Sequence, residues 1–213
     1  MCRAVKKNRA ILPLHQTEAD IRGQEVLQDR ALIEATLMNS NAYAAVIRCY
    51  EIVLRRYIRR ILGHHSQAAD DVLQEVFIKA YVNLRDYDMQ RPFGPWIYRI
   101  AHNEAINFLR KRRTEPPQVD GETASLILER LIDGFDVSEE FEKKCDAEII
   151  QNAMGSLDRR YHEALVLRFL EDKSYGEISE ILEIPAGTVA THINRGLKQL
   201  KKCLTTSSGA RQI

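Results

Sequence analysis

The stretch Ser174-Tyr-Gly-Glu-Ile-Ser-Glu-Ile-Leu-Glu-Ile-Pro-Ala-Gly-Thr-Val189 predicts two helices joined by a tight turn. Ser174 and Glu177 form the S-x-x-E pattern of a capping box, which starts the first helix. Pro185 interrupts that helix, and a second helix is expected over residues 187–204. Two helices joined in this way are typical of the helix-turn-helix motif, whose second helix enters the major groove of DNA. The alternative interpretation is an ordinary helical hairpin with a basic end.

The second helix of this pair carries side chains suited to DNA. Val189 and Ile193 have the spacing of an inward face. Hydroxyl groups and free backbone N–H groups at a helix start can hold a phosphate, and cationic or polar side chains further along can reach base edges. The candidate DNA-binding residues are Thr188, Thr191, His192, Arg195 and Lys198.

Helical periodicity also dominates the rest of the chain. Residues 31–62 fit two amphipathic helices with a break near residues 38–41, and the pattern resumes over residues 70–84 and 96–113. A loop is expected over residues 85–95, which contain Pro92, Gly94 and Pro95. No segment has the alternating pattern of a strand. The sequence therefore predicts an all-α protein.

The segment after this loop mixes aromatic, amide and cationic side chains. Aromatic rings that stack on bases, next to cations that hold the backbone, are what binding of single-stranded DNA requires. Asn103 and Asn107 lie one helical turn apart and share a face. Alternatively, Trp96 is simply part of the core, as large aromatic residues commonly are. The candidate residues of this segment are Trp96, Arg99, Asn103, Asn107 and Lys111.

A third constellation places acidic side chains on a helix that is apolar on its other side. It comprises Asp71, Gln74 and Glu75, followed by Phe77. An acidic face of this kind can bind a basic protein surface. The alternative is a face that is only solvated.

The net charge of +1 for 213 residues conceals separate charged blocks. Residues 36–113 hold 13 basic and 7 acidic residues, a net charge of +6, whereas residues 114–140 hold 1 and 8, a net charge of −7. Residues 141–185 hold 6 and 10, and residues 186–213 hold 5 and none. The pattern indicates two helical units with basic faces and an acidic connection between them.

Several classes of protein are not indicated. No apolar run reaches the roughly 20 residues that span a bilayer, and no signal peptide is evident. The sequence lacks a glycine-rich phosphate loop, a metal-ligand cluster and a nucleophile–base motif, so we expect no enzyme, metal, cofactor or small-molecule substrate. The four cysteines are far apart, and neither a zinc site nor a disulfide framework is expected.

In combination, these motifs resemble a bacterial RNA polymerase sigma factor of the extracytoplasmic-function (ECF) type, in the sigma-70 family. The motifs that carry the resemblance are Asp71-Val-Leu-Gln-Glu-Val-Phe77, Trp96-Ile-Tyr-Arg-Ile-Ala-His-Asn103, Leu157-Asp158, Ser174-Tyr-Gly-Glu-Ile-Ser179 and Ile184-Pro-Ala-Gly-Thr-Val189. The resemblance implies two small helical domains joined by a flexible acidic linker. Its boundaries are a disordered N-terminal extension (1–28), a region 2 domain (29–113), the linker (114–140), a region 4 helix-turn-helix domain (141–204) and a tail (205–213).

The resemblance also implies roles for the candidate residues. It implies that Asp71, Gln74, Glu75 and Phe77 dock on the β′ clamp helices of core RNA polymerase, that the β flap is a further contact, and that residues 85–95 receive a flipped −10 base. It implies that Trp96, Arg99, Asn103, Asn107 and Lys111 bind the −10 element, and that Thr188, Thr191, His192, Arg195 and Lys198 bind the −35 element. A cytoplasmic location and an anti-sigma factor, in some cases tethered to the inner membrane, are implied as well.

The sequence departs from this family at several positions. Basic residues are usual where this chain has Ala190, His192 and Leu197, so its −35 helix is less cationic than expected. This departure keeps open a sigma mimic that sequesters an anti-sigma factor. A stand-alone helix-turn-helix regulator is the other alternative. The apolar segment 126–132 is expected either to contact a partner or to pack on its own domain.

Overall fold

The computed structural model of the protein describes residues 18–112, 126–127 and 157–209. Within these ranges the ordered elements are helices and no strand occurs, which confirms the predicted all-α fold. Among the described helices, none combines the length and the apolar character that crossing a bilayer requires.

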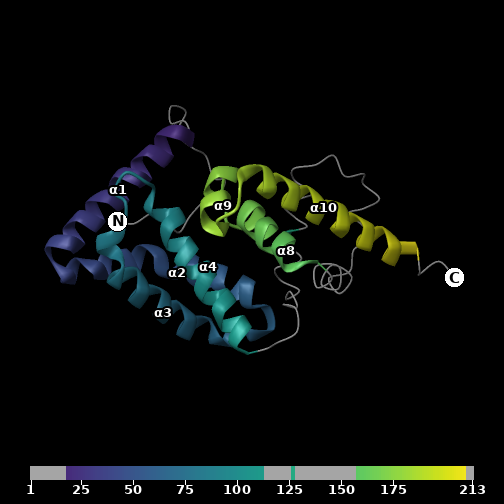
Figure 1. The fold of residues 1–213 in the computed structure, drawn as a ribbon, viewed down its shortest axis with the longest axis horizontal. Helices are drawn as coiled ribbons and strands as arrows, with labels where there is room; N and C mark the ends of the chain where they lie inside the picture. Colours follow the sequence, from purple (N-terminus) through teal and green to yellow (C-terminus); the bar gives the residue numbers. More distant parts are fainter. Residues whose placement is uncertain (1–17, 113–125, 128–156, 210–213) are drawn as a thin grey trace.

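The helices α1 to α4 form what we call the N-terminal unit (Figure 1). The break expected near residues 38–41 is confirmed, because Asn39 accepts a hydrogen bond from the backbone N–H of Asn41 and starts a 3₁₀ turn there. The aspartates Asp70 and Asp71 occupy the first turn of α3, where the helix dipole favours negative charge. The four helices are α1 (Glu18–Met38), α2 (Tyr43–Leu62), α3 (Ala69–Val82) and α4 (Phe93–Lys111).

Two expectations about helix boundaries are wrong. Helix α1 begins at Glu18, so residues 18–28 continue the first helix and are not a disordered extension. Helix α4 begins at Phe93 and includes Pro95 in its first turn, whereas the loop was expected to run through Pro95. A proline is compatible with the first turn of a helix, because its fixed φ is helical and its missing N–H would have no partner there.

The C-terminal unit consists of α8 (Arg159–Leu165), which continues into a π-helical turn (Val166–Leu170), α9 (Tyr175–Leu182) and α10 (Ala186–Gly209). The predicted capping box is confirmed. The Ser174 hydroxyl accepts a hydrogen bond from the Glu177 backbone N–H at 3.2 Å, and the Glu177 carboxylate accepts one from the Ser174 backbone N–H at 2.8 Å. The predicted helix-turn-helix is therefore present, with its turn at residues 183–185.

The packing of α10 on α8 depends on Gly196. A Cβ atom at this position would lie 3.0 Å from Cδ1 of Leu165 and 3.2 Å from Cβ of Tyr161, closer than ordinary van der Waals contact. Glycine therefore lets α10 and α8 approach closely, and the two helices contact each other (Figure 1).

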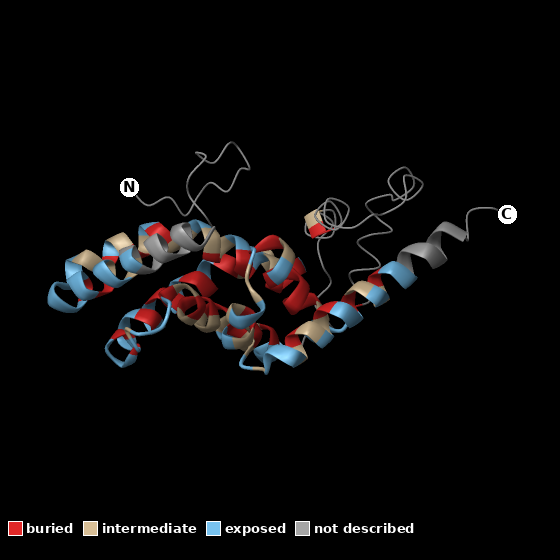
Figure 2. Ribbon diagram, turned by 90° about the horizontal axis from the view of Figure 1, so that it is seen from above, coloured by how far each residue is buried: buried red, intermediate tan, exposed pale blue. Residues whose placement is uncertain are grey.

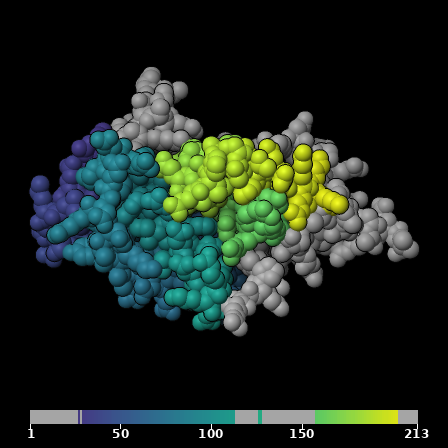
Figure 3. Space-filling model, viewed as in Figure 1, coloured from purple at the N-terminus to yellow at the C-terminus, as the bar shows by residue number. Residues whose placement is uncertain are grey.

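The two units lie directly against each other (Figure 3). Buried side chains from both units form one continuous hydrophobic cluster, and α4 contacts α9 across the boundary (Figure 2). Ile127 is completely buried and Leu126 packs against the same cluster, so the apolar segment packs on its own protein at these two residues. The rest of that segment and most of the predicted linker fall outside the described residues.

A further expectation, that the chain contains no disulfide, is wrong at Cys49. It is buried on α2 and is disulfide-bonded, although the sequence indicated no disulfide. The spacing of cysteines along the chain does not report which sulfur atoms lie close in space.

Candidate nucleic-acid interface

The exposed side of α3 carries most of the predicted acidic constellation. Asp71, Gln74 and Glu75 are exposed, and Ile78, one turn further along, keeps half of its surface exposed. These four residues, spaced i, i+3, i+4 and i+7, lie on one side of the helix, and we call them the α3 face. The structure places Phe77 elsewhere: its side chain is buried in the core.

Ile78 was missed by sequence reasoning, which named Phe77 as the apolar member of this constellation. A signal was present, because Ile78 follows Asp71 by two helical turns and therefore falls on the polar side. Val82, at the end of the helix, is also exposed. Exposed apolar residues next to charged ones are typical of protein-binding surfaces.

The predicted residues of α4 also share one side. Trp96, Arg99, Asn103 and Asn107 are spaced i, i+3, i+7 and i+11, and we call them the α4 face. Asn103 is exposed, while Asn107 is half-buried and its amide lies 3.5 Å from the Glu104 carboxylate. Lys111 is exposed in the last turn.

Trp96 is partly packed against the core and partly exposed. It is half-buried, and its ring lies 5.2 Å from that of Tyr87 and 5.3 Å from that of Phe93. Burial raises the pKa of Tyr87 to about 12, so its hydroxyl stays protonated and donates a hydrogen bond to the Arg91 carbonyl. This cluster of rings fixes the loop before α4 against the helix while leaving part of the indole exposed.

A pocket of about 250 Å³ opens beside Trp96. Tyr87 and Arg99 contribute to its wall from the N-terminal unit, and Glu180 contributes from α9. Close by, the Arg99 guanidinium lies 3.6 Å from the carboxylate of Glu183, the residue that ends α9. The start of the α4 face therefore meets acidic side chains of the C-terminal unit.

The predicted residues of α10 differ in exposure. Thr191, Arg195 and Lys198 are exposed, and Asn194, which was not predicted, is exposed beside them. We call these four residues the α10 face. The Thr191 hydroxyl donates a hydrogen bond to the Gly187 carbonyl at 2.9 Å.

Thr188 and His192 are both half-buried. The His192 ring stands edge-on to that of Tyr161, with ring centres 5.6 Å apart, and burial lowers the pKa of this imidazole. Burial thus favours the neutral form of His192, and its packing on Tyr161 supports the position of α10 on α8.

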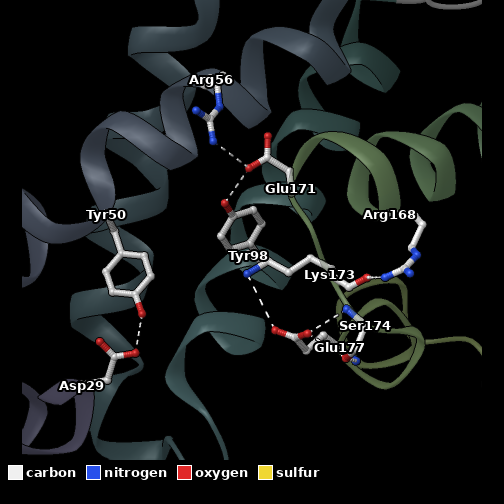
Figure 4. A network of polar contacts seen from close by, with 9 residues as sticks. All are labelled: Asp29, Tyr50, Arg56, Tyr98, Arg168, Glu171, Lys173, Ser174 and Glu177. Carbon is white, nitrogen blue, oxygen red and sulfur yellow. Dashed lines mark hydrogen bonds and ion pairs between the residues drawn. The ribbon is translucent and has the colours of Figure 1, made fainter. Parts of the chain in front are cut away.

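A buried polar cluster joins the two units (Figure 4). The Glu171 carboxylate, from the segment after α8, pairs with Arg60 at 2.5 Å and Arg56 at 3.4 Å, and accepts a hydrogen bond from the Tyr98 hydroxyl at 2.9 Å. The Lys173 ammonium lies 4.3 Å from the centre of the Tyr98 ring. Burial raises the pKa of Tyr98 and lowers that of Arg60. Sequence reasoning missed this cluster, because Glu171 lies 73 residues from Tyr98 and 111 residues from Arg60 along the chain.

A second polar contact crosses the same boundary. His102 on α4 lies 3.8 Å from the Glu163 carboxylate on α8, and its Nδ1 forms a hydrogen bond of 2.9 Å with the Tyr57 hydroxyl. Burial lowers the pKa of His102 to about 4 and raises that of Glu163 to about 7. In the part of the chain that the structure describes, no group of three His, Cys, Asp or Glu side chains is arranged to hold a metal ion.

Comparison with known families gives two matches. The family described as Sigma-70 region 2 matches residues 46–115, and the one described as Sigma-70, region 4 matches residues 147–200. The first match contains the α3 and α4 faces, and the second contains the α10 face.

Similar proteins cover most of the chain. The ECF RNA polymerase sigma factor SigW of Bacillus subtilis (strain 168) is 32% identical over 170 residues, which are 78% of this chain and 90% of SigW. The RNA polymerase sigma-H factor of Pseudomonas aeruginosa is 30% identical over 187 residues, covering 83% of this chain and 94% of that protein.

Two solved structures have a similar fold. CnrH, in complex with the cytosolic domain of CnrY, is 23% identical with a TM-score of 0.59 and covers 84% of this chain and 97% of CnrH. The sigma factor RpoE of Bartonella quintana, in complex with the anti-sigma factor NepR, is 19% identical with a TM-score of 0.54 and covers 76% and 96% of the two chains.

Proposed function

This chain belongs to the ECF group of the sigma-70 family of RNA polymerase sigma factors, and on that premise we propose which of its surfaces carries each step of promoter recognition. As a sigma factor, it binds core RNA polymerase and directs promoter recognition, DNA melting and transcription initiation. Catalysis of RNA synthesis stays with the polymerase, and the chain itself supplies only binding surfaces. The observation that carries the assignment is that some of the predicted polar side chains are exposed on each of three separate helices. They are Asp71, Gln74 and Glu75 on α3, Asn103 and Lys111 on α4, and Thr191, Arg195 and Lys198 on α10.

The α3 face docks on the β′ clamp helices. Asp71 and Glu75 supply negative charge toward a basic partner surface, and Ile78 adds apolar area that becomes buried on docking. Phe77 supports this face from the core: the Tyr43 hydroxyl donates a hydrogen bond of 2.7 Å to its carbonyl, which ties α3 to α2. In this proposal Phe77 keeps α3 in place, and Ile78 makes the contact that the sequence analysis gave to Phe77.

The α4 face holds the separated −10 strand. The exposed part of Trp96 offers a surface on which a base stacks, Arg99 and Lys111 offer charge to phosphates, and Asn103 offers an amide to a base edge. The pocket beside Trp96 has room for one extruded base.

The α10 face reads the −35 element in the major groove. Arg195 and Lys198 contact phosphates or bases, and Thr191 and Asn194 supply hydrogen bonds. Because His192 packs on Tyr161 and its burial lowers its pKa, it acts as a support, and Thr188 holds a backbone phosphate near the start of the helix.

We further propose that an anti-sigma factor restrains the chain in the bacterial cytoplasm, in some conditions from the inner membrane. The structures of CnrH and RpoE, which share its fold, are of complexes with such partners.

The decisive experiment adds the purified chain to sigma-free core polymerase and maps run-off transcripts from genomic DNA. Transcripts that start at defined sites are expected, and core polymerase alone is the control. Tight binding to an anti-sigma factor without any transcripts would instead favour the sigma mimic, for which the low charge around Ala190 and Leu197 is the argument.

A further inference from the structure

The aromatic cluster beside the pocket continues inward to helix α2. Phe93, the first residue of α4, is buried, and its ring lies 5.3 Å from that of Tyr87 and 5.3 Å from that of Trp96. The Tyr50 ring on α2 stands edge-on to Phe93, with ring centres 5.4 Å apart. The two rings that line the pocket therefore rest on Phe93, and Phe93 rests on Tyr50.

The orientation of Tyr50 is set by a residue of α1. Its hydroxyl donates a hydrogen bond of 2.5 Å to the Asp29 carboxylate (Figure 4). Hydrogen bonds to an ionised acceptor are stronger than neutral ones, and a bond at the far end of a tyrosine restricts the orientation of its ring. The same hydroxyl lies next to the start of α4, because a Cβ atom at Gly94 would lie 3.8 Å from it. Asp29 is therefore bonded to the ring that supports the pocket wall.

Helix α1 also contacts the segment that forms the pocket. It packs against α4 and against the 3₁₀ turn Leu84–Asp86, and Asp86 lines the pocket. Burial and, as a smaller effect, the negative charge of Asp29 raise the pKa of the Tyr87 hydroxyl to about 12. The match to Sigma-70 region 2 begins at residue 46, so Asp29 lies outside it. A residue beyond the matched segment thus supports the pocket from behind.

We propose that Asp29 is a positioning residue of the −10 site. Through Tyr50 and Phe93 it holds Trp96 in the orientation in which an extruded base stacks on the exposed part of the indole. Asp29 itself contacts no DNA, and α1 becomes a supporting part of the −10 reader. The inference rests on the proposed function of the pocket, but the position of Trp96 can be measured without DNA.

Trp96 is the only tryptophan of the chain, so tryptophan fluorescence of the full-length protein reports directly on the pocket. The variant Asp29→Ala removes the acceptor of the Tyr50 hydroxyl. Acrylamide should then quench Trp96 more strongly than in the wild type, with unchanged helix content by circular dichroism. Asp29→Asn keeps an oxygen acceptor and should restore quenching close to the wild-type value. The matched control is Glu34→Ala, which removes a carboxylate from an exposed ion pair within α1 and should leave quenching unchanged.

A DNA readout tests whether this support serves the base. The probes are nontemplate −10 strands of a promoter found in the run-off experiment, each with one abasic site, bound to the complete holoenzyme. In the wild type, removal of the base that enters the pocket should weaken binding about tenfold, because its stacking on an aromatic ring is lost. In Asp29→Ala the loss at this one position should largely disappear, and the losses at the other positions should stay the same. A general loss of stability would instead weaken the binding of every strand by the same factor.

Tyr50→Phe repeats the test with a smaller change, because it removes the hydroxyl and keeps the ring that packs on Phe93. It should reproduce both effects, so the inference stays testable if Asp29→Ala does not fold. Unchanged quenching of Trp96 in these variants would overturn the positioning role. More strongly quenched Trp96 with full sensitivity to the abasic site would overturn the link to base stacking. If run-off transcription fails while Trp96 is still released in both variants, the support stands and the proposed function is what fails.

Discussion

Helices α4 and α10 each present amide and cationic side chains along one side, but they differ in what covers that side. On α4, Arg99 pairs with Glu183 of the other unit and Trp96 borders a pocket that α9 helps to close. On α10, Thr191 and Arg195 are exposed. The difference lies in tertiary contacts and not in the residue types of either helix. The start of the α4 face is therefore in contact with the C-terminal unit, whereas Asn103 further along α4 and the α10 face are exposed.

The largest expected effect comes from Glu75→Lys, which removes the docking on which both helices depend. A like charge facing a basic partner surface costs several kcal/mol, so affinity for core polymerase should fall about 100-fold or more. Fluorescence anisotropy of the labelled chain with core polymerase measures this loss. Glu34→Lys, a charge reversal on α1, should leave affinity unchanged. If Glu75→Lys binds core as the wild type does, the α3 face is not the docking surface.

Gly196→Leu tests the α10 face by disturbing the packing of α10 on α8, while α4 keeps its sequence. The new side chain must displace Leu165 and Tyr161, and overpacking of this kind costs about 1–3 kcal/mol. Urea denaturation should show a destabilised C-terminal unit, and binding of −35 duplex DNA should weaken. Gly187→Ala is the matched control, because a Cβ there meets nothing within 4 Å. Equal stability of the two variants would contradict the role given to Gly196 in seating α10.

Asn103→Ala changes the α4 face and leaves α10 intact. The loss of a base contact costs about 1–2 kcal/mol, so promoter opening should fall roughly tenfold. Permanganate reactivity of the −10 strand measures opening, and the affinity for core polymerase serves as the internal control. An equal loss of promoter opening and of core binding would contradict the assignment of Asn103 to binding of the −10 strand.

The smallest expected effect is a pH dependence at the boundary between the units. Burial raises the pKa of Glu163 from 4.5 to about 7, so its contribution to stability is present at low pH and lost as the pH rises. Burial lowers the pKa of His102 from 6.5 to about 4, so its contribution is lost as the pH falls. Between pH 4.5 and 6.5 the two contributions oppose each other, and the free energy of unfolding of the wild type should change little.

His102→Gln should reveal the contribution of Glu163. Glutamine can still form a hydrogen bond with the Tyr57 hydroxyl, because its amide both donates and accepts, but it does not titrate. The variant should lose stability as the pH rises from about 5 to about 7, measured by urea denaturation at several pH values. A pH profile that matches that of the wild type would contradict the opposing shifts.

The sequence predicted the helices, the capping box at Ser174 and the exposure of Asn103, because these depend on local periodicity and side-chain chemistry. It did not predict Glu171, whose partners Arg60 and Tyr98 come from distant segments. Nor did it predict that His192 packs on Tyr161, because periodicity alone does not distinguish the edge of a buried face from the middle of an exposed one.

The position of α9 has a consequence for exchanging parts between related sigma factors. Helix α9 supports α10 in the helix-turn-helix, and the same helix touches α4. A chimaera that received the C-terminal unit of a relative would acquire a new −35 preference and, at the same time, new contacts with α4. To change the preference alone, an engineer would transplant the α10 face and retain Glu171, Lys173 and Glu183 from the recipient.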